Sequence, residues 1–270
     1  MQLELLSRPS GGPQRSVSIL LVHGICLGAW VWETNFLPYL AERGFSTHAL
    51  SLRGHGTSDG RAQIRHWRLK DFAADLEWAI KRIGGRVVVV GHSMGGGVAQ
   101  HYLLRGGKAA GLVLMASAPP HGLLRASMAM YHRNPALWDE LSRVRFTSVR
   151  NVDWEIIERG MLSHPQSGEK REQLIRQMGE PAVAASFDLM GWRPIAPFPW
   201  ATPPMLVIGG EKDEFIPTLD VQLTGVYYGV RPVMLKDCAH AIMLESTWQE
   251  AAGHLCNWLI TTFEGEGRRR

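Results

Sequence analysis

A run of four valines ends in the segment Gly91-His-Ser93-Met-Gly95, and this segment constrains the fold of the chain more than any other. The valine run is typical of a buried strand, and the small residues that follow it are typical of a helix start. Glycines on both sides of Ser93 let strand and helix pass close together, and the sharp turn between them exposes the serine hydroxyl in a strained backbone conformation. The order strand, turn, helix therefore predicts a nucleophilic serine.

A nucleotide-binding turn is the main alternative for this glycine-rich segment. The glycines stand at positions 91, 95, 96 and 97, which does not fit the G-x-G-x-x-G spacing of dinucleotide-binding turns. No Lys-Ser or Lys-Thr pair follows to form a phosphate-binding loop. The nucleophile interpretation is the stronger one, but a serine hydroxyl reacts poorly unless a base removes its proton. The chain must therefore supply a histidine and an acid.

The base and the acid are expected after Ser93 in the order serine, acid, histidine. His240 and Asp213 each follow a short apolar strand, and open α/β sheets carry their catalytic groups past the carboxyl ends of strands. We assign the base to His240 and the acid to Asp213, whose role would be to orient the imidazole. The neighbouring Glu211 and Glu214 are interpreted as solvated loop charges.

The other histidines are given structural roles. His92 adjoins the serine, but adjacent side chains at a sharp turn point apart, so His92 is not expected to be the base. His23 is expected to hydrogen-bond loop backbone, and His55 to pack near the site as a turn residue. The chain contains neither His-Glu-x-x-His nor a cysteine-rich ligand spacing, so we expect no metal and no cofactor.

Acyl transfer also needs hydrogen-bond donors for the developing oxyanion. A strand over residues 16–22 leads into a loop containing Ile25, and Met94 directly follows the nucleophile. The backbone N–H groups of Ile25 and Met94 are the expected oxyanion hole. Cys26 lies in the same loop, but no base is linked to it by a motif, and it is interpreted as a loop cysteine.

With these segments assembled, the chain resembles the α/β-hydrolase superfamily. The segment from His23 to Trp32 is similar to the small-molecule esterase and hydroxynitrile-lyase branch, whereas other signatures look more like bacterial esterases and monoacylglycerol-type lipases. The resemblance covers nearly the whole chain except its middle. The motifs that carry it, in family order, are His23-Gly24, Arg53-Gly-His-Gly-Thr-Ser-Asp59, Gly91-His-Ser93-Met-Gly95, Gly210-Glu-Lys-Asp213 and Ala239-His240.

Composition is that of an ordinary globular protein. Of 270 residues, 45% are hydrophobic and 20% charged, which suffices for one buried core. The apolar runs are too short to span a membrane, and no secretory signal is evident at the N-terminus. Three cysteines without disulfide spacing predict a reduced, cytoplasmic protein. The net charge of +4 includes the terminal Arg268-Arg269-Arg270, interpreted as a solvated end, so nucleic acid is not an expected partner.

Apolar segments alternate between strand and helix patterns along the chain. This alternation predicts an α/β fold with a doubly wound, mostly parallel sheet, formed by residues 1–120 and 200–270. Strands are expected near residues 16–22, 46–52, 86–91, 111–116, 204–209 and 231–236, with an antiparallel edge strand near 2–7. Helices are expected at residues 30–43, 70–83, 94–106, 217–228 and 247–262.

Residues 121–199 interrupt this alternation. Prolines stand at both ends of the segment, and a stretch of this length cannot be a plain loop in a compact domain. We expect a helical cap over the serine, as the superfamily often has at this point. The helices expected in it are Ser127–Val144, Asp153–Leu162, Glu169–Met178 and Pro181–Met190.

Large, soft side chains are frequent in the expected cap. Some of them must form the contact between cap and core, but together they predict an apolar substrate pocket. The residues proposed to line it are Trp138, Trp154, Met161, Met190 and Trp192. Cationic side chains of the same segment could pair with an anionic substrate, although surface solvation is expected for most of them: Arg125, His132, Arg143, Arg145 and Arg150.

These features predict a cofactor-independent serine esterase for apolar, small or medium-sized substrates, acting as a monomer or homodimer. Hydroxynitrile-lyase-like, carbon–carbon bond hydrolase and perhydrolase chemistry remain alternatives, because the serine turn does not discriminate among them. A hydrolase-like ligand-binding receptor is a third possibility. Epoxide hydrolysis is disfavoured, because those members of the superfamily carry an aspartate where Ser93 stands.

Overall fold

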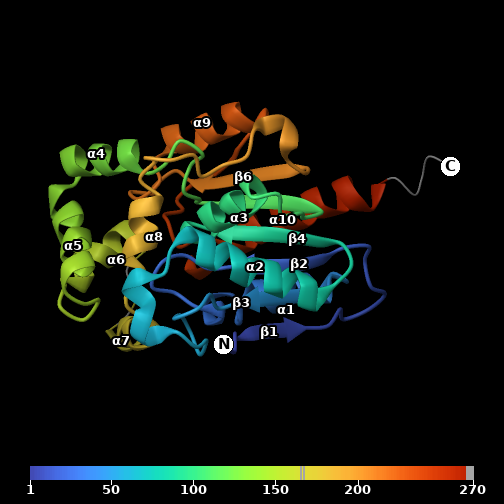
Figure 1. The fold of residues 1–270 in the computed structure, drawn as a ribbon, viewed down its shortest axis with the longest axis horizontal. Coiled ribbons are helices and arrows are strands. Elements are labelled where there is room, and N and C mark those ends of the chain that lie inside the picture. The colour runs from blue at the N-terminus through green and yellow to red at the C-terminus, as the bar shows by residue number, and fades with distance from the viewer. Residues whose placement is uncertain (165, 167, 266–270) are drawn as a thin grey trace.

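A seven-stranded sheet forms the centre of the computed structural model, which describes residues 1–164, 166 and 168–265 (Figure 1). The strand order is β1-β3-β2-β4-β5-β6-β7, and all neighbours pair in parallel except the edge strand β1, which pairs antiparallel with β3. The predicted mostly parallel sheet and its antiparallel edge are confirmed. The strands are β1 (Leu5–Arg8), β2 (Ser18–Val22), β3 (Thr47–Leu50), β4 (Val87–His92), β5 (Gly111–Met115), β6 (Met205–Gly210) and β7 (Val233–Leu235).

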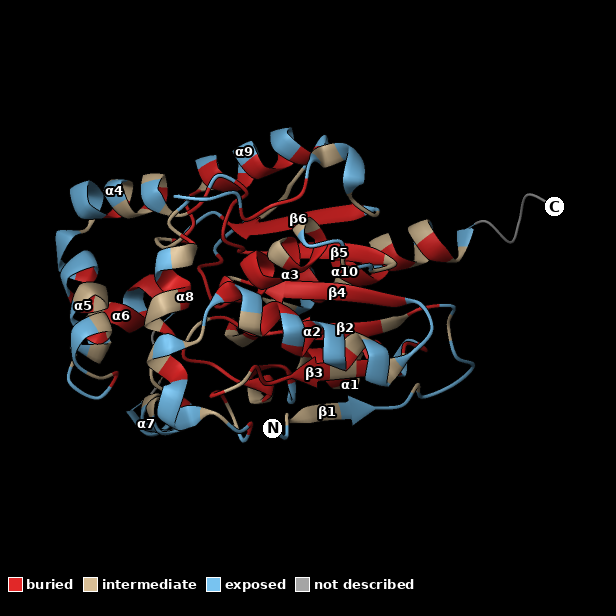
Figure 2. Ribbon diagram, in the orientation of Figure 1, coloured by how far each residue is buried: buried red, intermediate tan, exposed pale blue. Residues whose placement is uncertain are grey.

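Helices cover both faces of the sheet. Successive side chains of a strand point to opposite faces, so Ile19 and Leu21 pack towards α1 and α10, whereas Leu20 and Val22 pack towards α2, α3 and α9. Figure 2 shows that the central strands are buried. Both faces therefore bury apolar side chains, as a doubly wound fold requires. These helices are α1 (Phe36–Glu42), α2 (Leu69–Ile83), α3 (Met94–Leu104), α9 (Thr218–Tyr228) and α10 (Trp248–Phe263), with short 3-10 helices η1 (Ala29–Trp32), η2 (Arg61–His66) and η4 (Ile242–Leu244).

Five helices follow β5 and precede β6, and they gather at the end of the sheet to which the parallel strands point (Figure 1). We call them the inserted helices. A sixth, short 3-10 turn, η3 (Pro199–Ala201), leads from them to β6. The inserted helices are α4 (Leu124–Arg133), α5 (Pro135–Phe146), α6 (Trp154–Met161), α7 (Gly168–Gln177) and α8 (Val183–Asp188).

Two expectations about helix continuity are wrong. The single helix expected over residues 127–144 is two helices, because Pro135 has no N–H to donate to the preceding turn and Asn134 instead caps α5 by accepting from the Leu137 amide at 3.2 Å. The helix expected at residues 30–43 is likewise divided into η1 and α1. The terminal Arg268-Arg269-Arg270 lies outside the described residues.

Carboxylates in ion pairs fasten the inserted helices to the elements around the sheet. Asp220 of α9 is fully buried and accepts hydrogen bonds from Arg125 of α4 and, at 2.9 Å, from His121. Burial alone would raise the pKa of Asp220, but the bonds from these two side chains outweigh it and lower that pKa. Asp188 of α8, which is only partly buried, pairs with Arg68 at the start of α2. Ion pairs thus set the position of the inserted helices.

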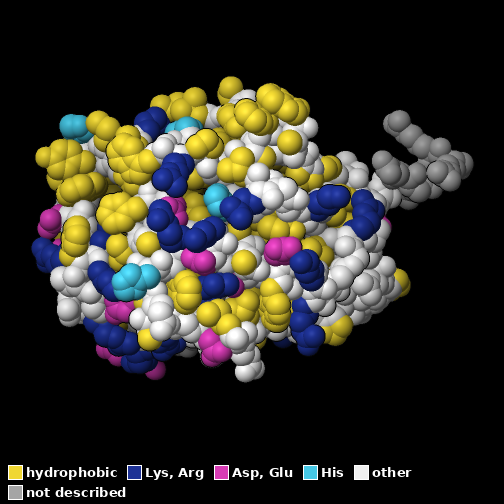
Figure 3. Space-filling view, in the orientation of Figure 1, with side chains coloured by type: hydrophobic (Ala, Val, Ile, Leu, Met, Phe, Trp, Pro, Cys, Tyr) yellow, Lys and Arg dark blue, Asp and Glu magenta, His cyan; other side chains and the backbone are white. Residues whose placement is uncertain are grey.

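Large hydrophobic side chains are exposed on the outer faces of α4 and α9, which appear as a yellow area along the upper edge of Figure 3. Among the described residues, no helix is long and apolar enough to cross a membrane.

Candidate active site

Ser93 occupies a sharp turn between β4 and α3. Its φ of 53° and ψ of −117° are unusual for a residue with a side chain, as expected for a strained nucleophile. The turn is possible because Gly95 has no Cβ atom. A Cβ at this position would lie only 2.5 Å from the carbonyl oxygens of Val22 and His23. Helix and sheet therefore approach each other as closely as glycine allows, and Ser93 is held at their junction.

A chain of hydrogen bonds joins the three residues that the sequence nominates. His240 Nε2 lies 3.0 Å from Ser93 Oγ, and His240 Nδ1 lies 2.9 Å from Asp213 Oδ2. The other carboxylate oxygen, Asp213 Oδ1, accepts from the backbone amides of Phe215 and Ile216, each at 2.8 Å. Both carboxylate oxygens are thus held, one by backbone amides and one by the imidazole, and the fixed carboxylate orients the imidazole in turn. Asp213 and His240 are 5% and 6% exposed, so water is largely excluded from this chain.

Two aromatic rings hold the His240 imidazole. Phe215 stacks on it with ring centroids 4.7 Å apart and an interplanar angle of 17°. His92 packs against it at 4.9 Å, and His92 Nε2 donates to the His240 carbonyl oxygen at 3.0 Å. Burial, with a contribution from nearby His240, lowers the pKa of His92 to about 3. His92 is therefore a neutral donor that supports the His240 loop, in agreement with its exclusion as the base.

The loop after β2 lies beside the serine. A Cβ atom at Gly24 would be 3.0 Å from the Ser93 Cβ, so the backbone of this loop lies directly beside Ser93. His23 holds the loop: its Nε2 accepts from the Leu52 amide at 3.0 Å and its Nδ1 donates to the Gly24 carbonyl at 2.7 Å. Burial lowers the pKa of His23 well below its usual value, which keeps the ring neutral for these roles. The expectation that His23 bonds loop backbone is confirmed.

The two amides nominated for the oxyanion flank this contact. Ile25 and Met94 both line the cavity that contains Ser93. In the described part of the chain, neither amide has a hydrogen-bond acceptor. Met94 is the first residue of α3, where helix amides lack intrahelical acceptors and the helix dipole favours negative charge. Both amides are thus available to an oxygen atom bound next to Ser93.

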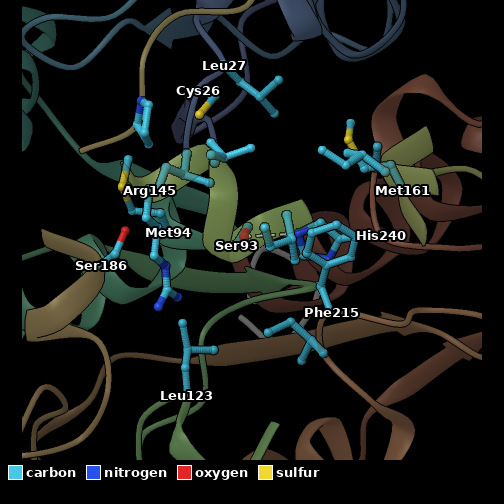
Figure 4. Close-up of a pocket in the computed structure, with 18 of the residues that line it drawn as sticks. Cys26, Leu27, Ser93, Met94, Leu123, Arg145, Met161, Ser186, Phe215 and His240 are labelled. Carbon is cyan, nitrogen blue, oxygen red and sulfur yellow. Dashed lines mark hydrogen bonds between the residues drawn. The ribbon is translucent and has the colours of Figure 1, made fainter. Parts of the chain in front are cut away.

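A cavity of about 180 Å³ opens between Ser93 and the inserted helices (Figure 4). Most of its wall is apolar, and three of the five predicted pocket residues belong to it: Trp138, Trp154 and Met161. Met190 and Trp192 do not. They follow the end of α8 on either side of Gly191, whose φ of 92° turns the chain, and Trp192 is 71% exposed. Assigning them to the pocket was wrong.

Phe215 and Arg145 also line the cavity, although no sequence motif assigns either of them to the pocket. Phe215 stands two positions after Asp213, and only the loop geometry reveals that its ring stacks on His240. Arg145 is one of the cationic side chains that could pair with an anionic substrate, and it lies in the cavity wall. A helical periodicity of apolar positions around Trp138 and Leu141 would have placed Arg145 on the same face.

The remaining candidates lie outside the hydrogen-bonded chain. Glu211 is exposed, whereas Asp213 is buried. Glu214 is partly exposed. Over the described ranges, no group of three or more His, Cys, Asp or Glu side chains is placed to hold a metal ion. Cys26 lies in the cavity wall, and burial raises the pKa of its thiol, which disfavours the reactive thiolate.

Comparison with known proteins agrees with this architecture. The profile of the alpha/beta hydrolase family matches residues 19–253, so the chain belongs to that family. An esterase from Exiguobacterium antarcticum has the same fold, with a TM-score of 0.75 and 18% identity over 95% of both chains.

Curated relatives match over shorter stretches. A non-heme haloperoxidase from Rhodococcus erythropolis is 39% identical over 106 residues, which cover 38% of this chain and 37% of the haloperoxidase. Methylesterase 9 from Arabidopsis thaliana is 37% identical over 79 residues, covering 28% of this chain and 30% of the methylesterase. The matched parts span about a third of the length of these relatives.

Proposed function

We propose that this chain is a serine hydrolase that cleaves carboxylic esters of small or medium-sized, mainly apolar substrates. The observation that carries the proposal is the continuous hydrogen-bonded chain from Ser93 through His240 to Asp213. A histidine with a serine on one ring nitrogen and a buried carboxylate on the other can act as a base towards the serine. The names of the esterases and the methylesterase among the similar proteins support the same class of reaction.

The proposed reaction proceeds through an acyl-enzyme. Ser93 Oγ attacks the ester carbonyl carbon while His240 Nε2 takes the hydroxyl proton, and the carbonyl oxygen becomes an oxyanion bound by the Ile25 and Met94 amides. His240 then donates the proton to the leaving alcohol oxygen. Water, activated by the same imidazole, attacks the acyl-enzyme and releases the acid. Asp213 keeps His240 in the required tautomer and stabilises its charged form.

We further propose that residues 121–199 act as a cap over this site. The inserted helices contribute much of the cavity wall, including Met130 of α4, Trp138 of α5 and Ile157 of α6. A largely apolar wall of this kind binds the hydrocarbon part of a substrate rather than a sugar or a phosphate. The cavity volume suits a single small acyl or alcohol group.

Turnover of p-nitrophenyl esters of increasing chain length tests the proposal. Ser93→Ala and His240→Ala should each lower kcat by about a million-fold, because the three residues act as a unit. Thermal unfolding of both variants at the wild-type temperature would show that the fold is retained. Near-native turnover by either variant would overturn the proposal.

Perhydrolysis is the second candidate, and the similarity to a non-heme haloperoxidase favours it. In this reaction hydrogen peroxide replaces water at the acyl-enzyme and releases a peracid. Peracid formation from acetate and hydrogen peroxide, at a rate above that of ester hydrolysis, would make this the principal activity.

The three cysteines are free and buried, which is in keeping with a reducing compartment. We therefore retain the cytoplasm as the proposed location.

A further inference from the structure

Helix α5 presents one face to the cavity. Trp138, Leu141, Ser142 and Arg145 all line it, and their spacing of three, four and seven residues places them along a single stripe of the helix. The stripe is apolar at its first two positions and ends in a hydroxyl and a guanidinium group. Arg145 is therefore part of the binding surface rather than of the outer face of α5.

Arg145 differs from the other arginines between β5 and β6. Most of those are paired with a carboxylate, and the unpaired ones, Arg133, Arg150 and Arg193, are exposed to solvent. Arg145 is only half-exposed, and among the described residues its guanidinium group has no acceptor. Burial lowers the pKa of Arg145, since no acidic partner offsets the lost hydration. The paired arginines are Arg125, Arg143, Arg159, Arg171 and Arg176, with Asp220, Asp139 and Glu140, Glu155, Glu158 and Glu172 respectively.

The backbone that carries Arg145 is fastened to the sheet domain. Arg65 of η2 donates to the Arg145 carbonyl oxygen and, at 3.4 Å, to the Thr147 carbonyl oxygen. The last carbonyl groups of a helix lack intrahelical donors, so a guanidinium group at this end is favourable. Arg65 thus fixes the end of α5, and with it the point from which the Arg145 side chain extends.

The cavity provides no competing anion. In the described parts of the chain, no Asp or Glu side chain lines it. Away from Ser93 and the histidines, the oxygen-bearing side chains of the wall are the hydroxyls of Ser127, Ser142 and Ser186. Ser186 donates to the Ala182 carbonyl of its own helix, which leaves its oxygen as an acceptor only. The wall therefore combines one unpaired cation with apolar surface, and this combination favours a ligand that has a hydrocarbon body and one negative charge.

Figure 4 shows the arrangement relative to the nucleophile. Arg145 lies on the same side as Ser186 and Met94 in this view, whereas Met161 and Phe215 lie on the other side of Ser93. A substrate whose ester carbonyl reaches Ser93 would extend in two directions, its acyl part and its alcohol part. One of the two would run towards Arg145.

We propose that Arg145 is a specificity residue that binds a carboxylate carried by the substrate at a distance from the scissile ester. The preferred substrates are then half-esters of dicarboxylic acids, or hydroxy acids that are acylated on the hydroxyl group and keep a free carboxylate. This inference rests on the proposed ester hydrolysis at Ser93 and names its substrate class. A guanidinium group suits a carboxylate because two parallel N–H donors match its two oxygens.

Paired substrates that differ in one charge test the inference. For an acyl-side carboxylate the pair is p-nitrophenyl hydrogen glutarate and p-nitrophenyl pentanoate; for an alcohol-side carboxylate it is 4-(pentanoyloxy)benzoate and 4-(pentanoyloxy)benzamide. Wild type should prefer the charged member of one pair. Arg145→Met should lower kcat/KM for that charged ester by about 10- to 100-fold, mainly through KM, and should affect its neutral counterpart far less.

Two variants serve as controls. Arg159→Met removes the same charge from an exposed position on α6 and should change neither pair. Arg145→Lys keeps the charge without the planar fork and should restore part of the preference. Thermal unfolding of Arg145→Met at the wild-type temperature would show that the fold is retained.

The outcomes separate this inference from the proposed function. Wild type that hydrolyses the neutral esters with no preference for either charged ester would overturn the role of Arg145 and leave the esterase intact, and so would an equal loss on both members of a pair in Arg145→Met. If no ester is hydrolysed, the proposed function fails, and calorimetry with 5-amino-5-oxopentanoate decides the carboxylate site alone. Binding to wild type but not to Arg145→Met supports the site, and equal binding or no binding overturns it.

Discussion

The two walls of the cavity are built on different principles. On the sheet side, Ser93 is set by backbone: Gly95 packs against carbonyl oxygens, and buried neutral histidines hold the adjoining loops. On the helical side, flexible side chains such as Met130 and Met161 form the surface, and ion pairs such as Arg125 with Asp220 fix the helices. On the sheet side, backbone packing tolerates few amino-acid substitutions. On the helical side, individual side chains can be substituted one at a time.

This difference matches what the proposed reaction requires of each wall. Acyl transfer requires the hydroxyl, the imidazole and the carboxylate to remain within hydrogen-bond distance of one another, and an error of about 1 Å is costly. Binding an apolar group requires only area and shape, to which methionine adapts readily. We therefore expect large effects from small changes on the sheet side and graded effects on the helical side.

After the losses expected for Ser93→Ala and His240→Ala, the largest expected effect concerns the carboxylate. Asp213→Asn should lower kcat for p-nitrophenyl butyrate by about 10,000-fold, because an amide would favour the wrong tautomer of His240. Binding of the substrate should change little. Steady-state kinetics measures both quantities.

Glu211→Gln is the matched control, since it removes an exposed carboxylate two residues away. Its kcat should stay within a factor of about two of wild type, as for most surface substitutions. Comparable losses in both variants would show that the acid was assigned to the wrong residue.

The next largest effect is expected when a glycine is replaced by alanine, which should destabilise the sheet side more than the helical side. In Gly95→Ala the new Cβ meets the Val22 and His23 carbonyl oxygens at 2.5 Å, and backbone of this kind cannot move aside. We expect a loss of about 3 kcal/mol in the free energy of unfolding. Urea denaturation monitored by tryptophan fluorescence provides the measurement.

Gly160→Ala in α6 is the counterpart on the helical side. Its Cβ would meet the end of the Leu137 side chain at 2.7 Å, which can rotate, and the edge of the Phe215 ring at 3.0 Å. Alanine also favours the helix over glycine by about 1 kcal/mol. The net change should stay below about 1 kcal/mol, and equal losses at both glycines would contradict the distinction between the walls.

The sheet side was the part that sequence could predict. Strand, turn and helix signals around Ser93 are local, and the order of Asp213 and His240 along the chain follows from where open sheets carry their loops. The same reasoning identified His23 as a support of the loop backbone. These residues belong to short motifs next to strands, so the local sequence is sufficient to identify them.

The helical side resisted prediction because its contacts depend on how helices pack. Trp138 and Trp192 look equivalent in sequence, yet one lines the cavity and the other is largely exposed. Pro135 is a local signal for the break between α4 and α5, because proline cannot continue the hydrogen bonding of a preceding helix. The unpaired state of Arg145 depends on five other arginines having found carboxylates, which no motif encodes.

The smallest expected effect is a pH dependence that belongs to the sheet side. His55 is fully buried against His23, and burial lowers its pKa to about 4 from an unfolded value near 6.5. Between these values the unfolded chain binds a proton that the folded protein does not, so stability is lost as the pH falls. This residue alone should cost about 1 kcal/mol between pH 7 and pH 5.5. Urea midpoints of wild type and His55→Gln at both pH values measure the change, and the variant should show a smaller pH dependence by that amount.

His132→Gln, at an exposed position of α4, should keep the wild-type dependence. If the dependence instead disappears with His132 and persists without His55, the acid-sensitive part of the molecule lies in the inserted helices, and the contrast between the two walls is wrong.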